Sequence, residues 1–178
     1  GKTDMIWTDL EAASTLAGDG WGVIARTGDS GNAGASDFSH DGEKVVYVSA
    51  AVVTSGLNLD NGGGDLWIVP YNGGEGGLSE RLIGANGSEY SESYPTFSAD
   101  DKLVAFTRVP PNLGSYFRPA SEVWVVPSTG GTSVRLAAND PPACSGELSP
   151  GVMNSWPKWS PKAQTSGGLT YYFMIFSS

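Results

Sequence analysis

The feature that most constrains the fold is a segment that recurs three times along the chain. Residues 38–49 (FSHDGEKVVYVS) return in altered form as residues 97–107 (FSADDKLVAFT), and a third copy begins at Trp159 and ends in the run 169–178 (LTYYFMIFSS). Each copy has an aromatic residue followed by serine, then a turn, then an apolar β-rich run closed by a hydroxyl residue. Self-similarity at a nearly fixed period is typical of stacked supersecondary units. The chain is therefore expected to repeat one structural unit.

A second segment recurs in step with the first. Residues 65–70 (DLWIVP) and 122–127 (EVWVVP) are each followed closely by Gly-Gly, which is a strong turn signal. With short outer strands at 80–83 and 134–136, each unit holds four strands separated by turns of Gly and Asp. Four strands per unit, with the units in sequence, predict the blades of a β-propeller.

The central run of each copy supports this prediction. Residues 45–48 and 103–106 are continuous apolar runs and do not alternate between polar and apolar. A strand inside a blade is covered by neighbouring blades and is therefore buried on both faces. The Val, Tyr and Phe content favours a strand over a short buried helix. The predicted fold class is all-β, a β-propeller of four-stranded antiparallel blades.

These motifs resemble those of a known family. The stretch 94–102 (YPTFSADDK) resembles the P-x-F-S-P-D-G-K signature of TolB-type, WD40-like (PD40) propellers, and residues 122–127 with their Gly-Gly resemble that family's D-L-W-V-V-P…G-G segment. The resemblance covers nearly the whole chain, although its units are longer than the family's usual ones. The departures from the signature lie in turns and are His40 and Ala99 in place of Pro and Asp101 in place of Gly.

In this register the chain begins and ends inside a blade. We expect one propeller segment over residues 1–178, made of a half blade (1–34), two blades (35–83 and 94–136) and another half blade (156–178). That is about three blade-equivalents, and the resemblance implies a propeller with more. The chain starts at Gly without an initiator Met or a signal peptide, so we expect a piece of a larger propeller. Missing blades or other chains are expected to complete the half blades, whose apolar edges would otherwise be exposed.

Composition narrows the classes of partner. The formal net charge is −9 with only 10 Lys and Arg residues, which argues against a nucleic-acid partner because that would need a basic face. No apolar run reaches the roughly 18 residues of a membrane helix, so no membrane span is expected. The single cysteine, Cys144, cannot form a disulfide within the chain. We interpret it as a structural thiol or as one that pairs with a cysteine outside this chain.

The long loops are expected to share one face of the propeller, opposite the short turns. Long loops on a rigid scaffold are where binding usually occurs, although such loops can also serve only to cover blade edges. The side chains predicted to meet a ligand or partner on this face are Glu89, Glu92, Tyr94, Arg108, Tyr116, Arg118 and Trp156. The tryptophans at equivalent or near-equivalent blade positions are instead interpreted as core; they are Trp7, Trp67, Trp124 and Trp159.

The sequence offers little support for catalysis. His40 is the only histidine and occupies a tight-turn position, and no G-x-S-x-G nucleophile elbow is present. Adjacent carboxylates such as Asp100 and Asp101 are interpreted as solvated loop charges. We therefore predict no catalytic residues and no enzyme activity in this segment.

One loop offers a possible metal site. Calcium prefers several oxygen ligands on a flexible backbone, and residues 58–65 (NLDNGGGD) supply them. The candidate ligands are Asn58, Asp60, Asn61 and Asp65. The stretch fails the EF-hand pattern, so a loop rich in turn-forming residues is the alternative. No cofactor other than this possible calcium is expected.

These observations lead to a functional hypothesis with two alternatives. We expect a non-catalytic binding or scaffold module that presents its loop-rich face to a protein or glycan partner. The resemblance implies a setting in the bacterial envelope, in the periplasm or at the cell surface. One alternative is the propeller of a prolyl-oligopeptidase-like hydrolase whose catalytic domain lies outside this chain. The other is a structural repeat unit of a surface assembly.

Overall fold

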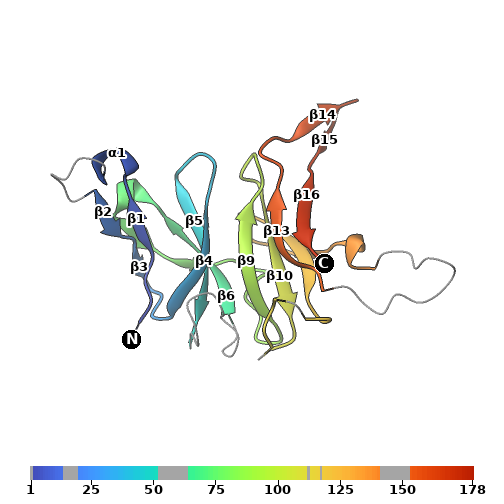
Figure 1. Ribbon diagram of the computed structural model, residues 1–178, viewed down its shortest axis with the longest axis horizontal. Coiled ribbons are helices and arrows are strands. Elements are labelled where there is room, and N and C mark those ends of the chain that lie inside the picture. Colours follow the sequence, from blue (N-terminus) through green and yellow to red (C-terminus); the bar gives the residue numbers. More distant parts are fainter. Residues whose placement is uncertain (1, 14–19, 52–63, 112, 117, 141–152) are drawn as a thin grey trace.

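The computed structural model describes residues 2–13, 20–51, 64–111, 113–116, 118–140 and 153–178. Its sheets stand side by side, with the N-terminal strands at one end of the molecule and the C-terminal strands at the other (Figure 1). Two of them are complete four-stranded antiparallel sheets in which the strands pair in chain order, with β7 left out of the first. Blade 1 is β4 (Asn32–Phe38), β5 (Lys44–Ala50), β6 (Gly64–Pro70) and β8 (Glu80–Arg81), and blade 2 is β9 (Ser91–Phe97), β10 (Leu103–Val109), β11 (Glu122–Pro127) and β12 (Val134–Arg135).

Smaller sheets flank the two blades. At the N-terminal end β1 (Ile6–Thr8) pairs with β2 (Trp21–Val23), and at the C-terminal end β13 (Ser155–Trp159) pairs with β16 (Met174–Ser177). β3 (Ala25–Thr27) pairs in parallel with β7 (Gly76–Leu78), which links the N-terminal segment to blade 1. The helices are short: α1 (Leu10–Ala13), η1 (Asn72–Gly74) and η2 (Ala137–Asn139).

The core lies between the sheets, which confirms the predicted fold class. Strands β5 and β10 are buried at every position after their first residue. One apolar cluster fills the space between blades 1 and 2, and a second fills the space between the N-terminal hairpin and blade 1. The fold is therefore all-β with blades of the β-propeller type, and each blade buries both faces against its neighbours.

The repeated turn owes its shape to one serine and one aspartate. The Ser39 hydroxyl donates a hydrogen bond to Asp41 Oδ1 (2.6 Å) and accepts one from the backbone N–H of Lys44 (2.9 Å). These bonds tie the end of β4 to the start of β5, and Asp41 Oδ1 also accepts a hydrogen bond from the backbone N–H of Glu43 (3.0 Å), which forms an Asx-turn. The second blade repeats both contacts with Ser98, Asp100 and Leu103.

The aspartate that departs from the family signature gains a contact between blades. Asp101 occupies the position of Gly42 in the first copy, and both have a left-handed backbone, with φ of 58° and 74°. Asp tolerates this region better than most residues. Its carboxylate accepts hydrogen bonds from the backbone N–H groups of His40 (2.7 Å) and Asp41 (3.0 Å), so the turns of the two blades are joined.

The first strand of each unit carries a bulge at the same position. In each of the three first strands one residue has a positive φ, and the pairing register with the next strand shifts there. The residues are Ala35, Tyr94 and Trp156, each three positions before the aromatic residue that ends its strand. Because the feature recurs in three copies, the positive φ belongs to the architecture and is not peculiar to one site.

The N-terminal tryptophan is out of step with the other blades by one residue. The backbone N–H of Ile24 bonds to Met5 O as that of Leu82 bonds to Leu66 O, so residues 4–7 align with residues 65–68. Trp7 therefore matches Ile68, although the sequence spacing suggested Trp67. A shift of one residue turns a side chain to the other face of a sheet.

Trp7 accordingly packs forward against blade 1. Its Nε1 donates a hydrogen bond to Gly74 O (3.1 Å), and its ring meets Tyr71 edge-on at 6.4 Å. A side chain at Gly22 or Gly74 would collide with the indole, so glycine is required at both positions. Trp7 belongs to the core, as predicted, but it lies on the opposite face of its sheet from the face that Trp67 occupies in blade 1.

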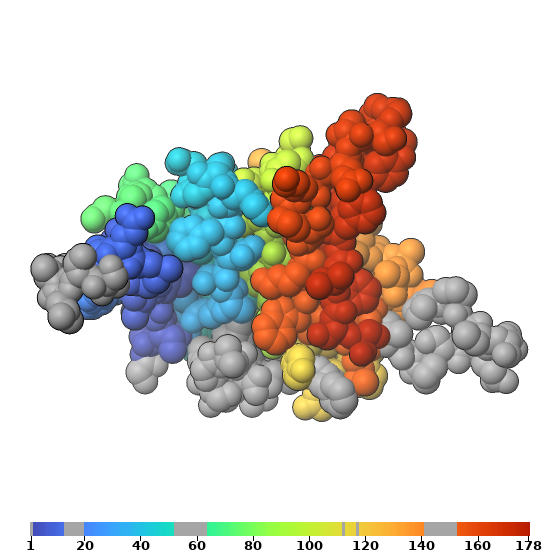
Figure 2. All heavy atoms as spheres, turned by 45° about the horizontal axis from the view of Figure 1, so that its top comes forward, coloured from blue at the N-terminus to red at the C-terminus, as the bar shows by residue number. Residues whose placement is uncertain are grey.

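The third copy differs from the predicted single strand over residues 169–178. β14 (Gln164–Ser166) and β15 (Leu169–Tyr171) form a separate two-stranded ribbon, and pairing with β13 starts only at Met174. Gly167 and Gly168 both have positive φ, as a two-residue hairpin turn requires. Figures 1 and 2 show this ribbon projecting beyond the tight turns of the other blades. Apolar content alone could not distinguish the ribbon from the blade strand that follows it.

Candidate functional site

Three aromatic side chains come together next to blade 2, and we call them the aromatic platform. Trp156 stacks on Tyr94 with ring centroids 5.4 Å apart and an angle of 17° between the planes. Tyr116 meets Trp156 edge-on at 6.3 Å and 80°. Trp156 is 48% exposed and Tyr116 is 50% exposed. The sequence had predicted all three as partner-facing residues, and the structure brings them into contact.

The scaffold holds the platform through several hydrogen bonds. The backbone N–H of Trp156 donates to Thr107 Oγ1 on β10 (3.1 Å). Ser115 O, next to Tyr116, accepts hydrogen bonds from the hydroxyls of Ser155 (2.8 Å) and Ser121 (2.7 Å). These bonds tie the loop that carries Tyr116 to β13.

The chemistry of the platform suits binding. Tyr and Trp bring large, rigid and partly polar surfaces, and they are enriched at the centres of protein interfaces. The two stacked residues lie on the recurrent bulges of β9 and β13, where the first copy has only Ala35. The architecture thus supplies the position in every unit, and only the later units place an aromatic ring there.

Glu92 and Arg108 were predicted to face a partner, but they are buried in the structure. Their side chains are 0% and 9% exposed and form an ion pair, with Arg108 Nε 3.0 Å from Glu92 Oε1. They belong to strands because β9 begins at Ser91 and β10 continues to Val109, beyond the predicted strand limits of 94 and 107. The pair therefore lies inside the blade and has no side-chain surface to offer a partner.

Arg108 is held from several sides. Its Nη2 donates to Gly84 O (2.6 Å), and its guanidinium lies 4.5 Å from the ring centroid of Trp124 and 4.8 Å from that of Tyr90. Cation–π contacts of this kind stabilise a partly desolvated guanidinium. The arginine thus joins β10, β11 and the loop after β8.

Glu92 is less well satisfied. Its Oε2 is buried and has no hydrogen-bond partner among the described residues. Burial raises the pKa of Glu92 to about 7, and Arg108 offsets this only in part, while the charge of Asp65 adds to it. No signal in the sequence separates this carboxylate from the exposed Glu89, because both follow polar loop residues.

The remaining predicted binding residues lie on loops. Glu89 and Arg118 are exposed, and the backbone carbonyl of Arg118 accepts a hydrogen bond from the N–H of Ser121 (2.9 Å). Both therefore remain available to a partner. Cys144 falls outside the described residues.

Most of the predicted calcium ligands also fall outside the described residues; they are Asn58, Asp60 and Asn61. The remaining one, Asp65, is paired with Arg81 at 2.9 Å. Burial raises the pKa of Asp65, and Arg81 counteracts this shift. Within the described part of the chain, no three His, Cys, Asp or Glu side chains are grouped to hold a metal ion.

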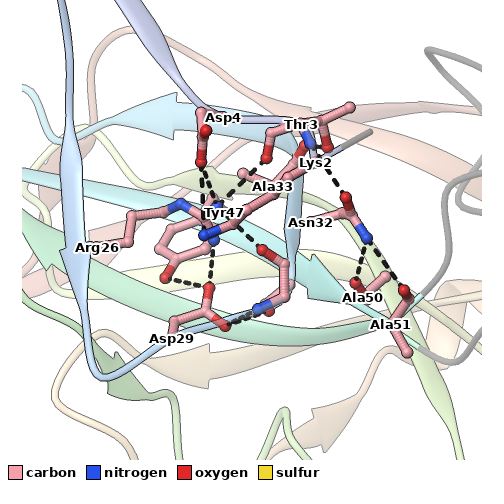
Figure 3. A network of polar contacts seen from close by, with 12 residues as sticks. Lys2, Thr3, Asp4, Arg26, Asp29, Asn32, Ala33, Tyr47, Ala50 and Ala51 are labelled. Atoms are coloured by element: carbon pink, nitrogen blue, oxygen red, sulfur yellow. Dashed lines mark hydrogen bonds and ion pairs between the residues drawn. The ribbon is translucent and has the colours of Figure 1, made fainter.

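A second polar cluster, which sequence reasoning missed, lies between the N-terminal segment and blade 1 (Figure 3). Arg26 forms an ion pair with Asp29, and its Nη2 also contacts Asp4 (2.8 Å). Asp29 further accepts hydrogen bonds from the hydroxyls of Tyr47 (2.9 Å) and Ser49 (2.7 Å). Asp29 lies in a short loop of small polar residues (28–31), and such a sequence does not indicate that its aspartate is buried.

An open cleft of about 410 Å³ adjoins this cluster. Its walls come from the loop after β3, the end of β5 and the outer strands of blade 1. Arg81 lies over the Trp67 ring, 5.1 Å from its centroid, and pairs with Asp65. Because these three side chains already satisfy one another and Asp29 is bonded from within, the cleft is a weaker candidate site than the aromatic platform.

The fold and these sites define a segment of a β-propeller without a recognisable catalytic constellation in its described residues. Comparison with protein-family models gives no match, and comparison with curated proteins gives none. Among solved structures, the chain is similar to TolB from Acinetobacter baumannii, with 16% identity and a TM-score of 0.48. The match covers 97% of this chain and 34% of that one, so this chain spans about a third of the length of the TolB structure. In the described residues, no helix has the length and apolar character needed to cross a membrane.

Proposed function

We propose that the chain is a non-catalytic binding module that docks a protein partner on its aromatic platform. The observation that carries this proposal is the aromatic platform on a rigid scaffold, in which the half-buried Tyr94 supports the exposed Trp156 and Trp156 meets the exposed Tyr116. Loops and strand ends held by a packed sheet are favoured places for binding. Arg118, exposed on the same loop as Tyr116, adds a residue type that is common at such interfaces.

The proposed setting is the bacterial envelope, in the periplasm or at the cell surface. This part of the proposal rests on the resemblance of residues 94–102 and 122–127 to PD40 motifs. The acidic net charge of −9 suits a soluble surface that meets basic or neutral partners.

The test uses the chain immobilised on a resin and incubated with an envelope extract. Trp156→Ala combined with Tyr116→Ala should weaken retention of the partner at least tenfold, because each large interface aromatic contributes on the order of 2 kcal/mol. Alanine is compatible with the bulge, since Ala35 has the same positive φ in the first copy.

The matched control is Trp21→Ala, which removes another exposed tryptophan on β2, at the opposite end of the molecule from β13. It should retain the partner as the unchanged chain does. Equal retention by the double variant and the unchanged chain would rule out the platform as the docking site. If the resin retains only glycans from the extract, and the double variant loses them, the partner would be a carbohydrate and not a protein.

A further inference from the structure

Blade 2 contains an arrangement of rings around an arginine that blade 1 repeats only in part. The guanidinium of Arg108 lies over two aromatic rings, 4.5 Å from the centroid of Trp124 and 4.8 Å from that of Tyr90. Arg108 is buried, so both rings and the guanidinium are packed together within the chain. Contacts of this kind between a cation and an aromatic face are attractive, and more so when water is excluded.

The strand register identifies the equivalent positions in blade 1. Trp67 takes the place of the blade 2 tryptophan, and Ser49 takes that of Arg108, because each holds the same register with its neighbouring strands. Gly31 takes the place of Tyr90, because each directly precedes the first residue of the first strand of its blade. Two large side chains of blade 2 are therefore replaced by serine and glycine in blade 1.

Blade 1 keeps a tryptophan under an arginine but lacks the second ring. Arg81 of the outer strand lies over the Trp67 ring, 5.1 Å from its centroid. Where blade 2 has its second ring, Gly31 and Ser49 line the open cleft of about 410 Å³. A Cβ at Gly31 would collide with Ser49 Oγ, which is hydrogen-bonded to Asp29. The chain therefore cannot supply a ring from this position.

We propose that the cleft is a second binding site, in which a neutral aromatic ring of a ligand stacks on the guanidinium of Arg81. This ring would complete in blade 1 the arrangement that Tyr90 completes in blade 2. Arg81 is accessible for the contact, because its side chain is 53% exposed. No residue that lines the cleft belongs to the aromatic platform, so this site does not depend on the proposed function.

The charges of the cleft favour a neutral ring over an ionic ligand. Each of its two carboxylates is paired with an arginine, Asp29 with Arg26 and Asp65 with Arg81. Neither pair leaves an unbalanced charge that would attract a small ion of either sign. A ring gains from its contact with the guanidinium through the quadrupole of its face, which requires no charge on the ligand.

The walls of the cleft indicate a ring with a hydrogen-bonding group at its edge. The exposed Ser30 lines the cleft together with Asp65. A phenol or an indole presents an apolar face to the arginine and one polar group at its edge. The cleft volume of about 410 Å³ lies within the range of about 300–1,000 Å³ that is typical of small-ligand sites. It therefore has room for the ring and for the atoms that carry it.

The first experiment titrates the chain with N-acetyl-tyrosinamide, a neutral phenol, and follows the backbone amide signals by NMR. We expect the signals of Gly31, Ser49 and Arg81 to shift and to saturate. N-acetyl-leucinamide, which has no ring, should bind at least about fivefold more weakly. Shifts that occur only at the aromatic platform, or equal affinity for the two amides, would overturn the proposal.

The same signals identify the source of the natural ring. An envelope extract is divided by ultrafiltration into a protein fraction and a small-molecule filtrate, and each is added to the chain bound to N-acetyl-tyrosinamide. Displacement of the amide by the protein fraction would assign the ring to a tyrosine or tryptophan side chain of a partner. Displacement by the filtrate would assign it to a free aromatic compound.

The second experiment compares two arginines at equivalent places in the two blades. Arg81→Ala should weaken the binding of N-acetyl-tyrosinamide at least about fivefold, because it removes the group on which the ring stacks. Arg135→Ala is the matched control and should bind unchanged, since Arg135 pairs with Glu122 and Asp140, far from any lining residue of the cleft in the fold's register. Neither arginine is buried, so both variants should fold. Unchanged binding by Arg81→Ala, or an equal loss in both variants, would refute the proposed site.

Discussion

The molecule contains two buried ion pairs of the same chemistry whose carboxylates behave in opposite ways. The first, Arg26–Asp29, lies between the N-terminal segment and blade 1, and the second, Arg108–Glu92, lies in blade 2. Burial acts on both carboxylates and would raise the pKa of each. The pKa of Asp29 is nevertheless lowered, whereas that of Glu92 is raised to about 7.

The number of hydrogen-bond donors explains the difference. Asp29 accepts hydrogen bonds from Ser49, Tyr47 and the backbone N–H of Gly31 (2.8 Å) in addition to its ion pair. Glu92 has one bond from Arg108, and its second oxygen has no partner among the described residues. A single arginine therefore does not compensate for the burial of a carboxylate, but an arginine with three further donors does.

Removing the cation from the well-satisfied pair should have the largest effect. Arg26→Met leaves Asp29 as a buried charge without its counter-ion and should lower the free energy of unfolding by about 3–5 kcal/mol at pH 7. Urea unfolding followed by tryptophan fluorescence measures this loss. Lys2→Ala, which removes only an exposed contact 3.8 Å from Asp4, should change stability by less than about 0.5 kcal/mol. A loss below about 1 kcal/mol for Arg26→Met would contradict this account.

Removing the cation from the other pair should have an effect that depends on pH. Arg108→Met should lower the free energy of unfolding by about 3 kcal/mol at pH 8 but only by about 1 kcal/mol at pH 5. At pH 5 Glu92 can be neutralised by a proton, because its pKa is already near 7. Urea unfolding at both pH values measures the difference. Equal losses at pH 5 and pH 8 would show that the proton does not replace the arginine.

Replacing the carboxylate of the second pair should remove a pH dependence. The pKa of Glu92 is higher in the folded chain than its usual value, so its stabilising contribution is present below about pH 4.5 and is lost as the pH rises through about 7. That loss is on the order of 3 kcal/mol. Glu92→Gln should therefore flatten the curve of unfolding free energy against pH between 4.5 and 8. Exposed Glu89→Gln serves as the control, and an unchanged slope in Glu92→Gln would show that Glu92 does not cause it.

Removing one donor from the first pair should have the smallest effect. Ser49→Ala should lower the free energy of unfolding by about 1 kcal/mol at pH 7. Because the lowered pKa of Asp29 stabilises the fold above its usual pKa, losing a donor should also move acid unfolding to a higher pH. Circular dichroism during acid titration measures the midpoint. The control is Ser91→Ala, whose buried hydroxyl has no partner in the described residues and should cost nothing measurable. An unchanged acid-unfolding midpoint in Ser49→Ala would show that Ser49 does not help to lower the pKa of Asp29.

The turns and the central strands were predictable because their causes are local. The Ser39 and Asp41 side chains close their turn within five residues, and the same spacing recurs at Ser98 and Asp100. The runs 45–48 and 103–106 require cover on both faces, which only stacked sheets provide. Tyr94 and Trp156 were predicted to lie on the loop-rich face; Trp156 is 48% exposed in the structure, whereas Tyr94 is half-buried.

The burial of the charged residues was not predictable from the sequence. Glu92 and Glu89 both follow polar loop residues, yet one is within a strand and the other is exposed. Whether Glu92 is buried depends on where β9 starts. That start depends on pairing with β10, which brings Arg108 to Glu92 from 16 residues further along the chain. The same limit applies to Trp7. Its register follows from the hydrogen bond between the backbone N–H of Ile24 and Met5 O, and not from its spacing to Trp67.

The amino-acid sequence alone determined the repeated unit, its turns and its apolar strands, because each depends on residues close together in the chain. Only the tertiary structure decided which face Trp7 occupies, which ion pair is fully hydrogen-bonded and which aromatic rings meet. These outcomes depend on contacts such as Tyr94 with Trp156, 62 positions apart, where one sheet lies against the next. Contacts between sheets depend on register and packing, and a linear pattern specifies neither beyond its own segment.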